Sequence, residues 1–259
     1  MGIALITGAG KRLGRAMALS LAEQGHDIAV HYASSATEAE SLCAELRAMG
    51  REARAFRADL TVEADIQGLV PAVRAAFGRP LTVLVNNASI FEYDSIASAT
   101  RDSWDRHFES NLRAPFVLIQ AFAAQVPDPV TDAAGEPVAQ GVVVNMIDQR
   151  VRKLTPEFTT YTLAKAALWT LTQTAAQGLA PRVRVNAIGP GPTMQGARQS
   201  AEHFAAQRAA TVLERGADPG DICAALRYLV EARSVTGQLI CTDGGQHLAW
   251  RTPDVLGVE

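Results

Sequence analysis

TGAGKRLG occupies residues 7–14, between an apolar run at residues 3–7 and an amphipathic segment at residues 12–24. A glycine-rich turn between a strand and a helix is typical of the first unit of a dinucleotide-binding α/β fold. The glycines allow a tight turn, and the free amides at the start of the helix can bind a pyrophosphate. The alternative is an ordinary turn without a ligand. In this strand–turn–helix context we expect phosphate binding.

Short β-branched runs alternate with amphipathic segments along the rest of the chain. The expected strands are residues 3–7, 27–32, 52–57, 81–86, 141–147, 183–188 and 237–242. The expected helices are residues 12–24, 36–49, 63–77, 101–126, 157–179 and 218–231. Strands joined by single helices form a parallel sheet through right-handed crossovers. The sequence therefore predicts one α/β domain over residues 1–259: a single Rossmann-type, doubly wound parallel sheet of about seven strands, flanked by helices on both faces.

Two segments depart from this alternation. Residues 127–140 are polar and contain three prolines, which predicts an exposed loop. Residues 190–217 begin with PGPT and continue as a charged helical stretch. Because they follow the carboxyl end of a strand, where ligands bind in doubly wound sheets, we expect them to form a substrate lid.

Composition and charge exclude several classes of partner. The formal net charge is −3, from 24 basic and 27 acidic residues, without a basic cluster, so nucleic acid and anionic membranes are unfavourable partners. The chain starts with an expected strand rather than a signal peptide, and no apolar run approaches the roughly 20 residues of a membrane span. Three widely spaced cysteines without a metal-ligand pattern predict reduced thiols and no metal site. We expect a cytoplasmic protein with a small-molecule substrate.

Asp148 ends the apolar run VVVNMI and stands 13 residues before Tyr161, and Lys165 follows one helical turn later. Residues four apart on a helix share a face, so the phenol and the ammonium should point into one space. A cation beside a phenol lowers its pKa, which makes it a proton donor usable near neutral pH. With the turn at residues 7–14, this pair predicts a nicotinamide-dependent reductase.

The cofactor preference depends on the end of the second expected strand. This strand ends in VHYASS, without the acidic residue that would bind free ribose hydroxyls. Arg12, His31 and the hydroxyls of Ser34 and Ser35 suit a 2′-phosphate, through charge-assisted hydrogen bonds. We therefore expect NADP(H) rather than NADH. Alternatively, His31 and Ser35 are only a strand end and a helix N-cap, and Arg12 binds the phosphate alone.

Together these motifs resemble the short-chain dehydrogenase/reductase family over nearly the whole chain. The turn is similar to the family pattern T-G-x-x-x-G-x-G, with Arg12 at the middle glycine. Further matches are ADL at residues 58–60 (adenine), NNAS at 86–89 (the cofactor turn N-N-A-G), GPGPT at 189–193 (nicotinamide carboxamide) and DGG at 243–245 (the usual ending). The resemblance implies these cofactor-binding residues: Gly8, Lys11, Arg12, Leu13, Gly14, His31, Tyr32, Ser34, Ser35, Asp59, Leu60, Asn87, Ala88, Ser89, Lys165, Pro190, Gly191 and Thr193.

The resemblance also implies four catalytic residues. Tyr161 and Lys165 match the catalytic pair, and Asn111 in ESNL matches the helix asparagine that supports a proton-relay water. Asp148 stands where the family has its catalytic serine, and Ser89 replaces the last glycine of N-N-A-G.

These departures narrow the resemblance to one group. Arg12, HYxxS, NNAS and Asp148 resemble pteridine reductases and bacterial dihydromonapterin reductases, and DGGQHL at residues 243–248 is similar to the latter. In pteridine reductases the aspartate and tyrosine serve proton transfer to the pterin, and a phenylalanine of the N-N-A-S loop stacks on it. The implied substrate-binding residues are Ser89, Phe91, Asp148 and Tyr161. Phe91 could equally be a hydrophobic anchor of its loop.

The chemistry of a carboxylate at position 148 agrees with this resemblance. A carboxylate beside the hydride acceptor repels a forming alkoxide and favours an acceptor that gains a proton at nitrogen, as a C=N bond does. A carboxyl close to Tyr161 would also share its proton, so that the pair titrates as one unit. The alternative is a salt bridge from Asp148 to Arg150 or Arg152, which leaves a generic reductase.

The leading hypothesis is therefore an NADPH-dependent reductase of a pterin or a similar C=N heterocycle. The alternatives are a carbonyl reductase of a sugar, ketoacyl or other ketone, and a non-catalytic NADPH-binding regulator.

The tail at residues 246–259 is long for the family. We expect Trp250 to pack at a subunit interface; alternatively, His247 or the tail reaches a neighbouring active site. The resemblance implies a homotetramer formed through the helices at residues 101–126 and 157–179.

Overall fold

A seven-stranded parallel sheet forms the centre of the computed structural model, which describes residues 2–196 and 199–252. Its strands are β1 (Ile3–Ile6), β2 (Asp27–Tyr32), β3 (Ala53–Arg57), β4 (Leu81–Asn86), β7 (Gly141–Met146), β8 (Val183–Pro190) and β9 (Leu239–Thr242). Their order is β3-β2-β1-β4-β7-β8-β9. The chain winds outward from β1 in both directions, so a ligand-binding crevice is expected beyond the carboxyl ends of β1 and β4. The predicted fold class is confirmed.

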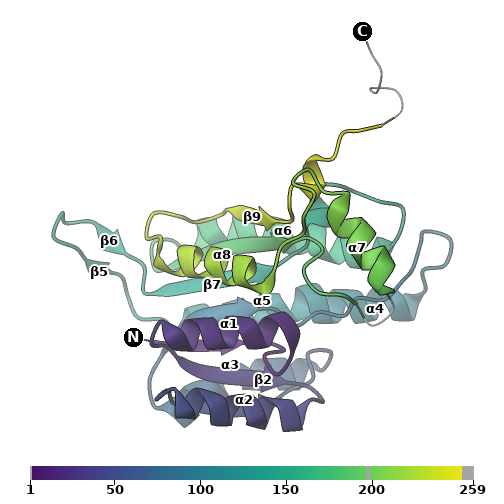
Figure 1. The fold of residues 1–259 in the computed structure, drawn as a ribbon. Helices are drawn as coiled ribbons and strands as arrows, with labels where there is room; N and C mark the ends of the chain where they lie inside the picture. Colours follow the sequence, from purple (N-terminus) through teal and green to yellow (C-terminus); the bar gives the residue numbers. More distant parts are fainter. Residues whose placement is uncertain (1, 197–198, 253–259) are drawn as a thin grey trace.

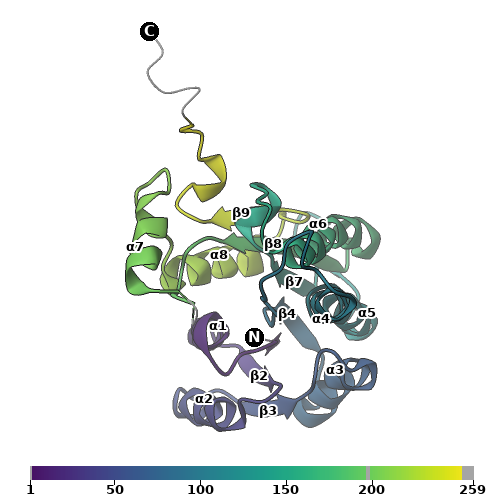
Figure 2. The same cartoon turned by 90° about the vertical axis from the view of Figure 1, so that its right-hand side faces the viewer.

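Helices cover both faces of this sheet (Figure 2). One face carries α1 (Arg12–Glu23), α2 (Ala36–Ala48) and α8 (Pro219–Glu231), and the other carries α3 (Glu63–Phe77), α5 (Ala114–Gln125) and α6 (Thr159–Leu179). Two shorter helices, α4 (Arg101–Phe108) and α7 (Ala201–Ala209), complete the set in the described residues. Strands and helices agree with the predicted ranges to within two residues at their outer ends.

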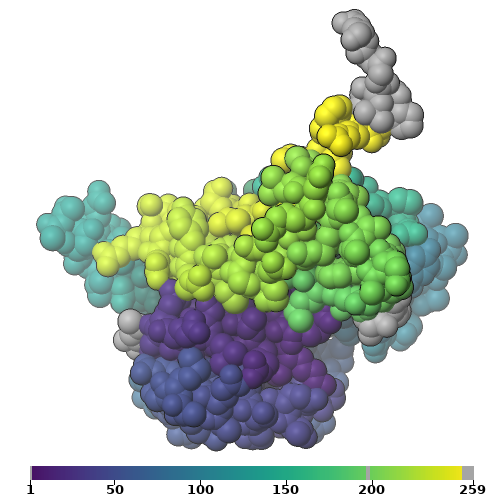
Figure 3. All heavy atoms as spheres, in the orientation of Figure 1, coloured from purple at the N-terminus to yellow at the C-terminus, as the bar shows by residue number. Residues whose placement is uncertain are grey.

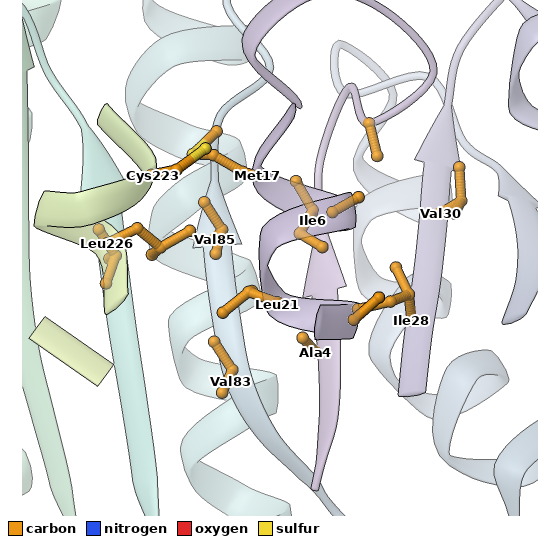
Figure 4. Packing of buried hydrophobic residues seen from close by; sticks show 14 of the residues in the cluster. Ala4, Ile6, Met17, Leu21, Ile28, Val30, Val83, Val85, Cys223 and Leu226 are labelled. Atoms are coloured by element: carbon orange, nitrogen blue, oxygen red, sulfur yellow. The ribbon is translucent and has the colours of Figure 1, made fainter. Parts of the chain in front are cut away.

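Successive residues of each central strand enter two separate cores. On β1, Ala4 and Ile6 pack with Met17 and Leu21 of α1, whereas Ile3 and Leu5 pack against the opposite layer. Figure 4 shows the first of these cores, with β1 between its neighbours β2 and β4. Because side chains alternate across a strand and both faces are buried, the strands are apolar almost throughout. This packing fixes the strand register and therefore the positions of the strand ends.

Two local features differ from the predicted pattern. The segment 101–126 is not one regular helix, because a π-helical turn, η1 (Glu109–Arg113), separates α4 from α5. The predicted loop at 127–140 contains a short antiparallel hairpin, β5 (Val130–Thr131) and β6 (Pro137–Val138). Two-residue exposed strands have no apolar alternation, which is why periodicity could not indicate them.

The segment expected to form a lid, residues 190–217, contains α7 and stands beside the N-terminal unit in Figure 3, where it is green. Residues 197–198 of this segment and 253–259 of the tail lie outside the described residues. Trp250 is exposed, on the last described stretch, which projects from the body of the molecule. Within residues 2–196 and 199–252, no helix has the length and apolarity to cross a membrane.

Candidate active site

The turn after β1 is tied to the end of β4. The Thr7 hydroxyl accepts hydrogen bonds from the backbone N–H groups of Asn87 (2.8 Å) and Ala88 (2.9 Å). The Asn87 side-chain amide donates in return to the Thr7 carbonyl, at 2.8 Å. Residues 7–14 and the NNAS turn at residues 86–89 therefore form one unit at the carboxyl edge of the sheet.

Glycine is required in this turn for lack of space. A Cβ on Gly14 would lie 2.2 Å from the Gly8 carbonyl oxygen and 2.8 Å from Asn87 Nδ2, and Gly8 itself has a φ of +63°. Lys11, the N-cap of α1, makes no side-chain capping hydrogen bond, so the first amides of α1 have no side-chain acceptor there. Free amides above a glycine cradle fit a pyrophosphate.

The other predicted cofactor residues follow the same edge of the sheet. They lie directly after strand ends: Tyr32, Ser34 and Ser35 at β2, Asp59 and Leu60 after β3, Asn87, Ala88 and Ser89 after β4, and Pro190, Gly191 and Thr193 at β8. Lys11 is exposed and pairs with Glu38 at 2.7 Å. Ser35 is the N-cap residue of α2 but its side chain makes no capping hydrogen bond.

His31 forms hydrogen bonds that hold the turn at residues 7–14, and it is not available as a charged partner for a phosphate. Its Nδ1 accepts a hydrogen bond from the Gly8 N–H at 3.0 Å, and its Nε2 lies 3.0 Å from the Ala58 carbonyl oxygen. Burial lowers the pKa of His31 to about 4, so the ring is neutral at pH 7. The expectation of a charge-assisted phosphate contact from His31 is therefore wrong, and Arg12, Ser34 and Ser35 are left as candidates.

Arg12 connects the turn to the lid segment. Its guanidinium donates to the carbonyl oxygens of Met194 (3.1 Å) and Gln195 (2.9 Å). Its φ is +52°, in the left-handed region that favours glycine, which explains why the family pattern has glycine there. An arginine at this position costs about 1–2 kcal/mol of backbone strain and adds a cation that contacts the lid segment.

Asp148 and Tyr161 are in direct contact. The Tyr161 hydroxyl donates to Asp148 Oδ2 at 3.0 Å, and the Arg150 backbone N–H donates to Oδ1 at 2.8 Å. The Arg150 side chain turns away to the Phe158 ring, 5.1 Å from its centroid, and to Thr155. No ion pair with Asp148 occurs among the described residues, so the salt-bridge alternative to Arg150 or Arg152 is not what the structure shows.

Lys165 is buried on the same side of α6 as Tyr161. Its Nζ donates to the Met146 carbonyl oxygen at 2.8 Å and lies 5.7 Å from the centroid of the Tyr161 ring. Burial lowers the pKa of Lys165 to about 8, and the Asp148 carboxylate opposes this shift. Lys165 thus lies near the tyrosine ring, as expected from the four-residue spacing.

The pKa of Tyr161 is shifted opposite to the expected direction. Burial raises it well above its ordinary value, and the charge and hydrogen bond of Asp148 add to the shift. The Arg150 charge and a Ser89 hydrogen bond oppose it only in part. Burial also raises the pKa of the Asp148 carboxyl, despite the hydrogen bonds it accepts. The expectation of a lowered tyrosine pKa is wrong, first because the phenol is buried and second because the Asp148 carboxylate accepts its hydrogen bond at 3.0 Å. Tyr161 and Asp148 are therefore a coupled pair, in which the protonated phenol donates to the carboxyl.

A cavity of about 760 Å³ opens beside Asp148. It is lined by the turn at residues 7–14, the loops after β4 and β7, and the lid segment at residues 190–217. Phe91 stacks on Phe158 at the wall of the cavity, with ring centroids 4.3 Å apart, and meets Tyr161 edge-on at 4.7 Å. Phe91 is 44% exposed and lines the cavity.

Comparison with known proteins shows the family of this chain. A family model described as "Enoyl-(Acyl carrier protein) reductase" matches residues 8–247. The chain is 30% identical, over 250 residues, to 3-oxoacyl-(acyl-carrier-protein) reductase FabG of Staphylococcus epidermidis, covering 95% of this chain and 98% of that protein. The chain belongs to the short-chain dehydrogenase/reductase family.

Solved structures of this family extend the similarity. The FolM alternative dihydrofolate reductase 1 from Brucella suis, in complex with NADP, is 42% identical, with a TM-score of 0.90 and 98% of each chain covered. A short-chain dehydrogenase from Burkholderia cenocepacia, in complex with NADP, is 32% identical, with a TM-score of 0.84, 95% of this chain and 97% of that chain covered.

In this short-chain dehydrogenase/reductase, Asn111 holds the loop after β4 that contains Phe91. It lies in η1, and its side-chain amide accepts from the Ile90 N–H at 2.9 Å and donates to the Ile90 carbonyl at 2.8 Å. Both amide atoms are therefore engaged with the backbone of the loop. The relay role inferred for Asn111 stays a prediction.

A buried polar network around Asp94 escaped the sequence analysis. The Asp94 carboxylate accepts from the Thr160 N–H and hydroxyl and from Ser103, and His107 Nδ1 lies 2.6 Å from the same Thr160 hydroxyl. His107 Nε2 accepts from the Glu92 N–H at 3.1 Å. These contacts fix the loop of Phe91 against the start of α6, immediately before Tyr161. A polar residue in an irregular loop gives no sequence signal of burial, so pattern analysis could not find it.

Gly14→Ala is expected to weaken NADPH binding by about tenfold or more and to lower the free energy of unfolding by about 1–3 kcal/mol, because a methyl group overlaps the Gly8 carbonyl. Fluorescence titration and chemical denaturation measure the two effects. Gly178→Ala is the control: it lies in α6 with no atom within 4 Å of the added Cβ, and should leave NADPH affinity unchanged. Wild-type NADPH affinity in Gly14→Ala would contradict the assignment of the cradle.

Proposed function

We propose that this protein is an NADPH-dependent reductase of a pterin or a similar C=N heterocycle. The observation that carries the proposal is the 3.0 Å hydrogen bond from the Tyr161 hydroxyl to Asp148 Oδ2, at the position of the family's serine. Reduction of a C=N bond adds hydride to carbon and a proton to nitrogen. A protonated phenol beside a carboxyl of raised pKa is a proton source for that nitrogen.

The same pair disfavours ketone substrates. A ketone gains negative charge on oxygen as hydride arrives, and a carboxylate within contact distance repels that charge. A nitrogen acceptor gains a proton instead, and a carboxylate stabilises the protonated ring. The aromatic pair of Phe91 and Phe158 suits a flat bicyclic ring better than an extended acyl chain.

The residues present fit an NADPH molecule, whose nicotinamide would supply the hydride. The glycine cradle and the amides of α1 would hold its pyrophosphate, and Arg12 with Ser34 and Ser35 would bind the 2′-phosphate. Lys165 would hold the nicotinamide ribose. The NADP named in the Brucella suis and Burkholderia cenocepacia structures supports this choice, and the name of the former, alternative dihydrofolate reductase, supports a pterin-like ring.

A carbonyl reductase is the second candidate function. Its support is the similarity to the Staphylococcus epidermidis 3-oxoacyl reductase. Measuring NADPH oxidation with dihydrobiopterin, dihydromonapterin and a panel of ketones separates the two candidates. Dihydropterin turnover with little ketone turnover is the expected result. Ketone turnover alone would overturn the proposal, and tight NADPH binding without turnover of any substrate would favour an NADPH-binding regulator. The homotetramer stays a prediction, to be checked by light scattering.

Asp148→Asn is expected to move the alkaline loss of NADPH affinity to lower pH. The pKa of Lys165 is about 8, and the Asp148 carboxylate raises it. An ammonium is charged below its pKa, so contact with the ribose weakens as pH rises through about 8 in the wild type. Removing the carboxylate charge lowers the lysine pKa and brings this loss to a lower pH. Titration of NADPH from pH 6 to 9 measures it without turnover.

Lys165→Arg serves as the control, since a guanidinium stays charged throughout that range. Its NADPH affinity should vary little with pH. An unchanged midpoint in Asp148→Asn would show that the carboxylate and the lysine are not coupled.

A further inference from the structure

Gln149 carries a buried hydrogen-bonding group without a partner. It directly follows Asp148, opens the 3-10 turn η2 (Gln149–Val151) and is only 6% exposed. Its Oε1 makes no hydrogen bond within the part of the chain that the structure describes. Gln149 also lines the cavity beside Asp148 and Phe91. A buried amide oxygen left without a donor lowers the stability of the folded chain, so its presence at a cavity wall points to a ligand.

The next residue, Arg150, also carries a buried polar atom, which is a hydrogen-bond donor rather than an acceptor. The Nε of Arg150 is buried and has no acceptor within residues 2–196 and 199–252, and Arg150 lines the same cavity. Its Nη1, by contrast, donates a hydrogen bond to the Thr155 hydroxyl. Two consecutive residues of η2 thus offer an acceptor and a donor that the protein itself does not use, whereas the Asp148 carboxylate already has partners at both oxygens.

We propose that the Gln149 carboxamide recognises the amide-like edge of the substrate ring, a ring N–H next to a ring C=O. This inference rests on the proposed reduction of a C=N heterocycle and narrows it to heterocycles that carry such an edge. A side-chain carboxamide holds an acceptor and a donor side by side, so it pairs with a ring N–H and C=O in two parallel hydrogen bonds. A ring without this edge would leave the buried amide unpaired and would bind more weakly.

The test compares two C=N substrates of similar size. 7,8-Dihydropterin carries the N–H and C=O edge, and 3,4-dihydroisoquinoline does not. In Gln149→Met, which keeps the length of the side chain but cannot form these bonds, we expect the KM for dihydropterin to rise about tenfold or more. The KM for dihydroisoquinoline and the dissociation constant of NADPH should stay unchanged. Gln149→Glu, which keeps an acceptor but loses the amide donor, should fall between wild type and Gln149→Met.

Two further measurements separate recognition from a structural role. The dissociation constant of pterin for the NADP⁺-loaded protein, from quenching of pterin fluorescence, should rise in Gln149→Met by the same factor. The melting temperature should not fall, because methionine removes an unpaired buried amide rather than a structural hydrogen bond. Gln173→Met, the same chemical change on the exposed face of α6, is the matched control and should leave all these constants unchanged.

Three outcomes would overturn the inference: equal KM increases for both substrates, a weakened affinity for NADPH, or a lower melting temperature with unchanged pterin binding. The pterin titration needs no turnover. A wild-type protein that binds pterin through Gln149 but reduces neither substrate would therefore refute the proposed reaction while supporting this recognition.

Discussion

Replacing Tyr161 with phenylalanine is expected to lower kcat for dihydropterin by about 10²–10⁴-fold while leaving NADPH affinity nearly intact. The variant removes only the hydroxyl, which donates to Asp148 at 3.0 Å. The ring keeps its edge-on contact with Phe91 and its place beside Lys165. The proton for the substrate nitrogen would then lack its donor, whereas the glycine cradle that holds the cofactor lies elsewhere. Steady-state kinetics and an NADPH titration measure both effects.

Tyr93→Phe is the matched control, because Tyr93 is 59% exposed and meets Phe158 only edge-on. It loses a hydroxyl from the same aromatic group without touching Asp148. We expect kcat within a factor of a few of wild type, which is the scale of a surface substitution. A Tyr161→Phe variant that loses NADPH binding and turnover in equal measure would show that the hydroxyl acts in binding rather than in proton transfer.

Asp148→Ser is expected to change the class of substrate. The serine restores the residue type found at this position in the family pattern, and it removes the negative charge beside the acceptor. Dihydropterin turnover should fall by about 10²–10⁴-fold, because the carboxyl that accepts the Tyr161 hydrogen bond is lost. Ketone turnover should stay or increase, because a hydroxyl can hydrogen-bond to the forming alkoxide where a carboxylate repels it.

The measurement is kcat/KM for dihydropterin and for a ketone panel in both proteins. Asp148→Asn, which has the shape of the carboxyl but no charge, separates the loss of the anion from the change in size. Unchanged dihydropterin turnover in Asp148→Ser would refute the role of the carboxyl. Ketone turnover that survives Asp148→Ala without any pterin activity would identify a carbonyl reductase instead.

The fold could be predicted because its signals are local. The turn at residues 7–14 and the apolar runs around β4 and β7 specify buried parallel strands joined by helices, and this order of elements allows few topologies. The spacing of Tyr161 and Lys165 predicted a shared helix face, since helix geometry alone fixes it. The hairpin of β5 and β6 was missed because its four residues are exposed or nearly so.

Electrostatics could not be predicted in the same way. The pKa directions of His31 and Tyr161 depend on burial and on neighbours distant in sequence: His31 is enclosed between Gly8 and Ala58, and Tyr161 faces Asp148. The spacing of Tyr161 and Lys165 shows the neighbouring cation but not the burial of the phenol, which is the largest cause of its raised pKa. The buried carboxylate of Asp94 was missed for a related reason, because only the folded structure shows that its loop buries the side chain.

The sequence by itself determined the family, the doubly wound sheet and the identities of the residues at its carboxyl edge. Hydrophobic periodicity and glycine spacing are local properties of the chain, so they can be recognised without the fold. Only the tertiary structure decided between the two contacts left open for Asp148, because it places the carboxyl against the Tyr161 hydroxyl and not against an arginine side chain. It also showed that the buried Gln149 Oε1 has no hydrogen-bond partner in the described residues. Contacts of this kind are set by how separate strand ends pack together. A proton position or an unpaired amide is a property of that packing rather than of any one segment.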